Sequence, residues 1–394
     1  MFLPKTVYRA CQIIDEETGL LLSHLPKWDI IRAKLSRRGD IMTEKSIGQD
    51  VEGVGDTAGL PLVVGVDLGG TQIRTAVMRG ATLLSRVGLL TGVNPTPERT
   101  IPRICTAIRQ ALDEAGVSIE QIAGSGVGAP GPLDSRTGVV FAPPNLPGWQ
   151  NTPLGDILRA EFHMPIYIEN DANAAALGEY LFGAGQGAHN LVYLTISTGI
   201  GGGIITEGKI LDGVSGTAGE LGHMTIDMHG PRCNCGNIGC LERLASGTGI
   251  ALRANEAIAL GQGDELLAFA LAHESLEDHG ADTPYDQRVA APHVNARTVA
   301  LAAEAGIPLA REIIAQTAEA LATGIVNILH IFNPDILILG GGVMQMGSLL
   351  LAPVQRIVRE RTMRVPYEAV KIVMAQLGTN AGLVGAGALI YHHL

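Results

Sequence analysis

The sequence predicts a mixed α/β protein built from two related halves, and three observations support this fold class. Hydrophobic residues make up 46% of the 394 residues, the proportion of a globular protein with a sizeable core. Apolar runs typical of buried strands alternate with stretches of helical spacing. A strand, a glycine-rich turn and a returning strand occur twice, which indicates duplication of one α/β unit.

The first half begins at Leu62, where LVVGV has the character of a buried strand. The turn DLGGT follows, and then the strand-like run IRTAVM. A third strand is predicted over TLLSRVGLL, and residues 98–115 have the apolar spacing of a helix. IAGSGVGAP is predicted to be another strand that leads into a turn.

The second half repeats this order from about residue 190. We predict a strand at LVYLTIS, a turn at TGIGGG and a returning strand at GIITEGKIL. A helix is predicted over about 309–332, the strand ILILGGGV follows, and the last helix is expected within 380–392. Residues 262–300 are polar, acidic and irregular, so they are predicted to form a surface insertion.

The composition argues against several classes of protein. The net charge of −11 is unfavourable for sequence-independent binding of nucleic acid. The sequence has no run of 18 apolar residues and no basic segment followed by a long apolar run near Met1. We therefore expect neither a membrane span nor a signal peptide, and a cytoplasmic location.

Three glycine turns follow buried strands, and each is able to expose backbone N–H groups to an anion. They are Asp67–Thr71, Thr198–Gly203 and Gly340–Gly342. The alternative to anion binding is a plain hairpin turn, and at Gly340–Gly342 it is close packing of helix and strand. Neither a Walker loop nor a Rossmann loop fits, because a second strand rather than a helix follows Thr71. Asp67 beside bound phosphates implies Mg²⁺, held through water.

Asp171 lies where a predicted strand, Ile166–Asn170, meets a predicted helix that begins near Ala172. One interpretation is that Asp171 is simply the N-cap of this helix. The other is that a carboxylate on such a rigid corner performs chemistry, and the two interpretations are compatible.

Three of the five cysteines, Cys233, Cys235 and Cys240, fall within eight residues. Three thiolates and one imidazole form a closed tetrahedral site, the usual arrangement for structural Zn²⁺. Three free buried thiols are the alternative. His223 and His229 compete as the fourth ligand.

These motifs together resemble the ROK family of repressors, open reading frames and kinases. The resemblance rests on DLGGT, the GAPGP turn at 128–132, ENDAN at 169–173, TGIGGG and the cysteine cluster, and it extends from Leu62 to the C-terminus. It implies an actin/hexokinase-like (ribonuclease H-like) fold with two lobes. It also implies ATP-dependent phosphorylation of glucose at the 6-hydroxyl, as in the glucokinases of the family, in carbohydrate metabolism and glycolysis.

The resemblance implies a role for individual residues. Asp171 corresponds to the catalytic base, and His223 to the fourth zinc ligand. Sugar binding is implied for Asn145, Asn170, Asp171, Glu220, His223 and Glu242; for Asn145 the alternative is a plain turn, and for the two glutamates it is a solvated surface acid. Nucleotide binding is implied for Asp67, Gly69, Gly70, Thr71, Gln72, Thr198, Gly199, Gly201, Gly202 and Gly341.

Two positions depart from the family pattern. Gln72 stands where lysine is common, so phosphate affinity is lower or Arg74 compensates. Ser197 replaces a common glycine. The family also suggests a homodimer.

The predicted organisation is an N-terminal arm and linker (1–60), an N-terminal lobe (61–170), a C-terminal lobe with the zinc site (171–378) and a final helix (379–394) that packs back on the first lobe. Fructose, N-acetylmannosamine or N-acetylglucosamine are alternative substrates. A sugar-responsive repressor is the alternative function. In such a repressor, a DNA-recognition helix would have to follow residues 27–45. The segment that does follow, SIGQDVEGVGDTAG, is too rich in glycine to form that helix, so we expect no nucleic-acid partner.

Overall fold

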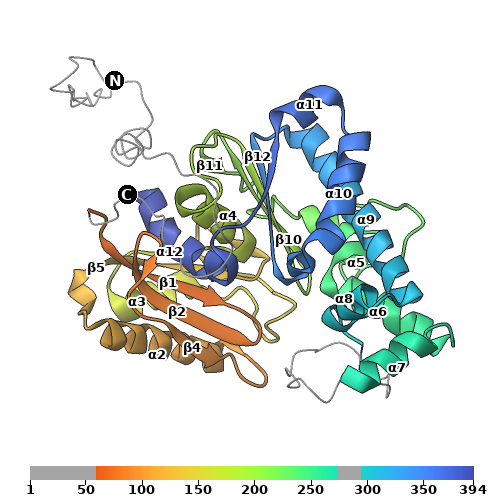
Figure 1. Cartoon of the computed structure of the whole chain (residues 1–394). Helices are drawn as coiled ribbons and strands as arrows, with labels where there is room; N and C mark the ends of the chain where they lie inside the picture. Colours follow the sequence, from red (N-terminus) through yellow and green to blue (C-terminus); the bar gives the residue numbers. More distant parts are fainter. Residues whose placement is uncertain (1–58, 274–293) are drawn as a thin grey trace, which may run out of the picture. The chain divides into compact units, whose positions relative to one another are not determined.

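The computed structural model describes residues 59–273 and 294–394, and residues 60–394 form one compact unit. The predicted N-terminal arm, apart from its last two residues, lies outside the described residues. So does the middle of the predicted insertion, residues 274–293. Figure 1 shows two β-sheets within the compact unit, each flanked by helices.

The first sheet has the strand order β3-β2-β1-β5-β8, and β4 pairs with β2. β1 is antiparallel to β2 and parallel to β5, which is in turn parallel to β8. The predicted third strand is wrong in its extent, because Leu84–Arg86 interrupt it and it forms the separate strands β3 and β4. The strands are β1 (Leu62–Leu68), β2 (Gln72–Arg79), β3 (Thr82–Leu83), β4 (Val87–Leu90), β5 (Ile122–Ala129) and β8 (Ile166–Asn170).

The second sheet has the order β11-β10-β9-β12-β13, which repeats the β3-β2-β1-β5-β8 order of the first and has no counterpart of β4. Again an antiparallel hairpin, β9–β10, lies beside two parallel strands. This repetition is what the predicted duplication requires. The strands are β9 (Leu191–Ile196), β10 (Ile200–Thr206), β11 (Lys209–Ile210), β12 (Ile336–Gly340) and β13 (Lys371–Met374); β6 (Leu133–Asp134) and β7 (Val139–Val140) form a small separate ladder.

The helices cover the sheets, and their bounds agree with the predictions for 98–115, 309–332 and the last helix. None of the helices in the described ranges is long and apolar enough to cross a membrane. They are α2 (Pro97–Ala115), α3 (Leu154–Phe162), α4 (Asp171–Phe182), α5 (Leu241–Ala245), α6 (Gly247–Ala259), α7 (Asp264–His273), α8 (Ala296–Glu304), α9 (Pro308–Phe332), α10 (Ser348–Arg361), α11 (Arg364–Ala369) and α12 (Ala381–His393).

The ends of the predicted irregular insertion are helical, so that prediction is wrong for α7 and α8. In α7, Leu266 and Ala270 are buried, and in α8, Val299 and Ala302 are buried. Both helices add these apolar residues to the larger core cluster. Of the acidic residues that suggested a loop, Asp264 and Glu265 lie in the exposed first turn of α7, where acids are favourable, and the others lie outside the described residues.

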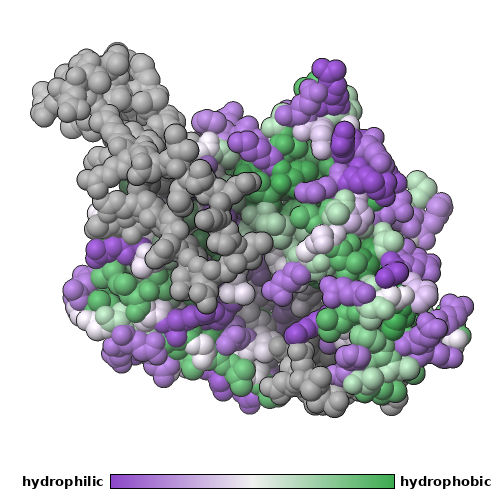
Figure 2. Space-filling model, viewed as in Figure 1, coloured by the Kyte–Doolittle hydropathy of each residue, from purple (hydrophilic) through white to green (hydrophobic). Residues whose placement is uncertain are grey.

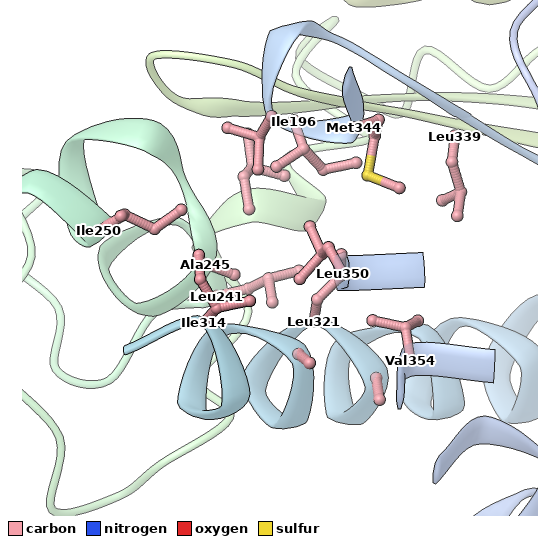
Figure 3. Packing of buried hydrophobic residues seen from close by; sticks show 14 of the residues in the cluster. Ile196, Leu241, Ala245, Ile250, Ile314, Leu321, Leu339, Met344, Leu350 and Val354 are labelled. Carbon is pink, nitrogen blue, oxygen red and sulfur yellow. The ribbon is translucent and has the colours of Figure 1, made fainter. Parts of the chain in front are cut away.

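Two buried clusters form the core, one associated with each sheet. In the second, α9 supplies Ile314 and Leu321, which face Ile196 of β9 and Leu339 of β12 (Figure 3). α10 closes the cluster from the side with Leu350 and Val354, among other residues. Burial of this apolar surface supplies most of the favourable free energy of folding.

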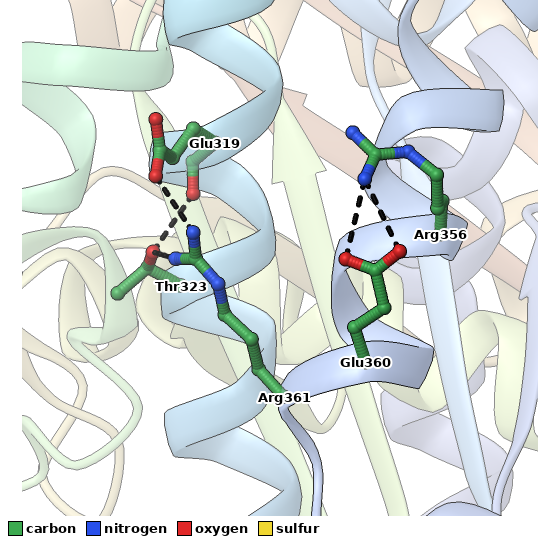
Figure 4. Close-up of polar contacts among 5 residues, drawn as sticks. All are labelled: Glu319, Thr323, Arg356, Glu360 and Arg361. Carbon is green, nitrogen blue, oxygen red and sulfur yellow. Dashed lines mark hydrogen bonds and ion pairs between the residues drawn. The ribbon is translucent and has the colours of Figure 1, made fainter.

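Surface ion pairs on α9 and α10 contribute much less. Arg361 donates to Glu319 at 2.7 Å, and Arg356 donates to both carboxylate oxygens of Glu360 at 3.2 Å (Figure 4). These side chains are exposed, and hydrophilic residues cover the outer faces of α10 and α11 (Figure 2). Exposed pairs of this kind contribute about 0–1 kcal/mol each.

α12 packs on both β1 and β5 of the first sheet and on α4, as Figure 1 shows. The approach is so close that the strands need glycine where the helix crosses them. A Cβ atom on Gly126 of β5 would overlap the carbonyl oxygen of Ala386 in α12.

We therefore expect Gly126→Ala to lower the free energy of unfolding by about 1–3 kcal/mol, because the added methyl group forces the helix away from the sheet. Urea denaturation measures the loss. Gly59→Ala is the control, since nothing lies within 4 Å of its Cβ position. If the two variants unfold at the same urea concentration, the described contact between α12 and β5 is wrong.

Candidate functional site

Polar residues gather at the carboxyl ends of the parallel strands of the first sheet, the usual location of ligand sites in α/β proteins. Asp67 of β1 pairs in register with Gly128 of β5. The Cβ position of Gly128 lies 3.6 Å from the Cα of Asp171. Glycine at 128 thus allows the ends of β1, β5 and α4 to meet, and the sequence-predicted residues Asp67 and Asp171 lie near each other.

Asp171 is the first residue of α4, and the N-cap of this helix is Asn170. The interpretation of Asp171 as the cap is therefore wrong by one residue. The Asn170 side-chain oxygen accepts from the backbone N–H of Ala172 at 2.9 Å and of Asn173 at 3.3 Å. The Asp171 carboxylate accepts from the N–H of Ala172 at 2.8 Å, and the residue is exposed.

The Asp171 carboxyl group has a strongly perturbed acidity. Water reaches it, yet the protein packed around it disfavours the charged form and raises its pKa to about 6. The negative charges of Asp67 and Glu220 raise the pKa further. A carboxylate with a pKa near neutrality is suited to accept a proton from a hydroxyl group.

Two backbone hydrogen bonds fix the turn Gly69–Thr71, one to the residue that follows it and one from a neighbouring loop. The N–H of Gly69 donates to the carbonyl of Gln72 at 2.9 Å, and the N–H of Thr91 donates to the carbonyl of Thr71 at 2.7 Å. The Cβ position of Gly70 is 3.0 Å from the backbone oxygen of Asn145. The predicted sugar-contacting loop and the predicted phosphate turn therefore touch.

Arg74 supplies the positive charge at this turn. It forms an ion pair with Asp67, and its other terminal nitrogen donates to the carbonyl of Thr379 at 2.9 Å. Asp67 is buried, whereas the Gln72 side chain is exposed and lies against Gly88. A single carboxylate of this kind fits Mg²⁺ only through water or together with bound phosphates.

The second glycine turn is shorter than predicted. Ser197–Gly199 form the turn, closed by a hydrogen bond of 2.8 Å from the Ser197 N–H to the Gly199 carbonyl, and β10 begins at Ile200. Gly201 and Gly202 therefore lie in a strand. Their missing side chains leave room for Ala172 of α4 and for the Gly219 carbonyl, respectively.

The third glycine turn meets the second. Gly341 follows β12 with φ of +91°, which favours glycine, and its Cβ position would overlap the backbone of Ile196 at the end of β9. The structure thus shows the close packing that the sequence offered as an alternative. The turn nevertheless borders Ser197, so it lies at the same sheet edge as Thr198.

The four predicted metal ligands converge. The ligand atoms of His223, Cys233, Cys235 and Cys240 all lie within 4.8 Å of one another. Cys235 Sγ is 3.6 Å from Cys240 Sγ, and Cys233 Sγ is 3.8 Å from His223 Nδ1. Zinc–sulfur bonds of about 2.3 Å in a tetrahedron give separations of about 3.8 Å, so the residues fit Zn²⁺. His229 is not part of this cluster.

His223 connects the metal cluster to the acidic residues. Its Nδ1 faces Cys233, while Nε2 lies 3.9 Å from the carboxylate of Glu220. A Glu220 oxygen is 4.0 Å from the Cβ position of Gly131, and Asn170 Nδ2 is 3.2 Å from the same point. The structure therefore brings Asn170, Glu220 and His223 around one region beside Asp171.

The sequence interpretation missed a buried pair beneath this region, Glu169 and Asn173. Both are nearly inaccessible to water, and the Glu169 carboxylate accepts from the Asn170 N–H at 2.8 Å and from Asn173 Nδ2 at 3.1 Å. Burial raises the pKa of Glu169 to about 7. Glu169 lies in β8, one residue before the N-cap Asn170, and a charged residue in a strand of otherwise apolar character was the signal that could have indicated it.

The raised pKa predicts a pH effect on stability. The folded state retains the Glu169 proton more tightly than the unfolded chain, whose pKa is near 4.5, so its contribution is complete below 4.5 and is lost as the pH rises through about 7. Glu169→Gln keeps the acceptor oxygen and cannot ionise. We expect the variant to gain stability relative to the wild type between pH 5 and about 7.5 in urea denaturation.

Glu161→Gln, at an exposed position, is the control and is expected to show no such gain. Parallel stability curves for the wild type and Glu169→Gln would show that Glu169 ionises freely in the folded protein.

Comparison with known proteins gives the family. The model of the ROK family matches residues 63–393. A glucokinase of Thermotoga maritima is 36% identical over 329 residues, which cover 83% of this chain and 96% of that protein. A putative xylose repressor of Caldicellulosiruptor is 31% identical and covers 84% of this chain and 78% of the repressor.

Comparison with solved structures leads to the same family. The crystal structure of a ROK family glucokinase from Streptomyces griseus, in complex with glucose and AMPPNP, superposes with a TM-score of 0.68 at 34% identity, covering 84% of this chain and 99% of that one. A ROK hexokinase from Thermus thermophilus gives 0.67 at 35% identity, with 84% and 98% covered. These likenesses confirm the predicted actin/hexokinase-like fold. With the family match over residues 63–393, they establish that the chain belongs to the ROK family.

Proposed function

We propose that this protein is an ATP-dependent hexose kinase that phosphorylates glucose at its 6-hydroxyl. The observation that supports this most strongly is Asp171, a water-accessible carboxylate near Asp67 at the end of β1, with its pKa raised to about 6. Phosphoryl transfer to an alcohol needs a group that orients the hydroxyl and accepts its proton, together with donors that hold the phosphates.

In this proposal the hexose lies among Asn145, Asn170, Glu220, His223 and Glu242. Asn170 uses its oxygen to cap α4, so its Nδ2 remains to donate to a sugar hydroxyl. Glu220 accepts from hydroxyl groups, and a site built this way discriminates against sugars that lack them. Asp171 then accepts the proton of the 6-hydroxyl as the new bond to phosphorus forms.

ATP is proposed to lie against the turns Gly69–Thr71, Thr198–Gly199 and Gly341, with Gln72, Gly201 and Gly202 close by. Asp67 would hold Mg²⁺ through water, and the ion would neutralise charge on the transferred phosphoryl group. Zn²⁺ in the His223–Cys240 cluster would be structural, since four protein ligands leave no open position. The division into lobes 61–170 and 171–378, and a homodimer, remain part of the proposal.

The relatives also include repressors, so a sugar-responsive repressor is the second candidate. Two observations favour the kinase. The match spans 96% of the Thermotoga glucokinase but 78% of the putative xylose repressor. The described residues also retain the glycine turns and the acidic side chain at 171, of which a sugar-sensing repressor has less need than a kinase.

A coupled ADP-release assay with ATP and a panel of hexoses distinguishes the candidates. We expect glucose-dependent ADP release, with lower kcat/KM for fructose, N-acetylmannosamine and N-acetylglucosamine. In parallel, the full chain is tested for a specific DNA complex that the sugar dissociates. Absence of turnover with every hexose, together with such a complex, would establish the repressor instead.

The pKa of Asp171 predicts the acid limb of the activity. A general base must be deprotonated, so kcat/KM is expected to fall about tenfold per pH unit below pH 6 and to level off above it. The profile of kcat/KM against pH at saturating ATP measures this pKa. A limb near pH 4 would mean that Asp171 is not desolvated as described.

A further inference from the structure

Glu242 joins the metal-ligand segment to the second glycine turn. It lies in α5, two residues after the metal ligand Cys240. Its Oε2 accepts from the backbone N–H of Ile200 at 2.9 Å. The same oxygen is 2.5 Å from the Cβ position of Gly199, so the carboxylate occupies the space that any other side chain at 199 would need.

Two more hydrogen bonds fix the same turn to the residues that follow Glu242. The Gly247 N–H donates to the Ser197 carbonyl at 2.7 Å, and the Thr248 N–H donates to the Thr198 carbonyl at 3.2 Å. Residues 197–200 are therefore held at three points by residues 242–248.

The beginning of α5 is hydrogen-bonded to residues at and beside the metal ligand His223. The Leu241 N–H donates to the Met224 carbonyl at 2.9 Å, next to His223, and Cys240 Sγ contacts the His223 carbonyl at 3.5 Å. Only two peptide units separate Cys240 from Glu242. A rigid connection thus runs from the metal cluster to the Ser197–Ile200 turn.

We propose that Glu242 is a positioning residue for the nucleotide as well as a ligand of the hexose, an inference that rests on the proposed function. Its Oε2 holds the Ile200 N–H, which fixes the backbone that faces the nucleotide phosphates. Its Oε1 accepts no hydrogen bond from the residues that the structure describes and is left to accept from a sugar hydroxyl. One carboxylate therefore couples the two binding sites, and each ligand affects the affinity for the other equally.

The test measures binding of AMPPNP with Mg²⁺ to the full chain by calorimetry in the absence of sugar. Glu242→Ala removes the acceptor and is expected to weaken nucleotide binding about tenfold or more, the range for a hydrogen bond to a charged group. Glu242→Gln keeps an oxygen for the Ile200 N–H and is expected to stay within about threefold of the wild type.

Glu220→Ala is the matched control. Glu220 is another acid of the proposed sugar site, but it faces His223 rather than the turn. It is expected to leave the AMPPNP Kd unchanged and to weaken glucose binding. Gly199→Ala tests the same contact from the turn. Its methyl group displaces the Glu242 carboxylate, so this variant is expected to weaken AMPPNP binding as Glu242→Ala does.

The inference is overturned if Glu242→Ala or, should that variant not fold, Gly199→Ala binds AMPPNP as tightly as the wild type. Failure of the proposed function has a different signature. In that case the wild type releases no ADP with any hexose, whatever the order of the nucleotide affinities among the variants.

Discussion

Asp171→Asn is expected to reduce kcat for glucose phosphorylation at least ~100-fold, the lower end of what a general base contributes. Asparagine keeps the side-chain oxygen that accepts the Ala172 N–H, so α4 and its corner are preserved. It cannot take the proton of the 6-hydroxyl. Glucose affinity, measured by calorimetry, is expected to change little, because the other polar residues of the sugar region remain.

Asp156→Asn is the control for loss of a carboxylate on a helix, since Asp156 lies exposed in the first turn of α3. It is expected to retain the full kcat. An Asp171→Asn variant as active as the wild type would remove Asp171 from the mechanism, even if the protein proved to be a kinase.

Loss of the metal cluster has the second largest expected effect. Cys233→Ser replaces a ligand whose thiol lies buried against His223, and the protein is expected to contain less than one zinc per chain by elemental analysis. We expect the KM for glucose to rise at least tenfold, because His223 and Glu220 lose their fixed orientation. The melting temperature is expected to fall as well.

Cys105→Ser is the matched control for this variant. Cys105 is also buried and free, but it belongs to α2 in the other core cluster. It is expected to keep one zinc per chain and an unchanged KM for glucose. A Cys233→Ser variant that keeps both would show that zinc is held without Cys233, and a wild type without zinc would show that the four residues lie together without binding metal.

Local patterns were sufficient to predict much of this site. The alternation of apolar runs and glycine turns predicted the hairpins β1–β2 and β9–β10 and the strand before Asp171. The spacing of the three cysteines predicted a metal cluster, and the resemblance selected His223 over His229; in the structure the His223 ring lies with the three cysteines, with Nδ1 3.8 Å from Cys233 Sγ.

The remaining features depend on packing between segments distant in sequence. Gly201 and Gly202 look like a turn in the sequence, but α4 and the 219–221 segment press against them, which makes them strand residues that need no side chain. The position of Arg74 in the sequence does not indicate that it pairs with Asp67. The hydrogen bond between Glu242 and Ile200 could not be predicted either, because it spans 42 residues and depends on where the metal cluster anchors α5.

The helices α7 and α8 show a different limit of sequence patterns. The sequences of both helices, DELLAFALAH and ARTVALAAE, are mostly apolar, and the acidic and polar composition that suggested a loop belongs to the residues between them. Their stability comes from docking on α6 and α9 rather than from their own amphipathic pattern.

In the proposed mechanism the Asp171 carboxylate lies between a sugar hydroxyl and the terminal phosphoryl group of ATP. A crystal structure of the full chain with glucose and AMPPNP tests it most directly. We expect an Asp171 oxygen within about 2.6–3.2 Å of the glucose 6-hydroxyl, with that hydroxyl facing the γ-phosphate near the Gly69–Thr71 turn. Glucose bound with its 6-hydroxyl remote from Asp171, or a γ-phosphate away from that turn, would contradict it.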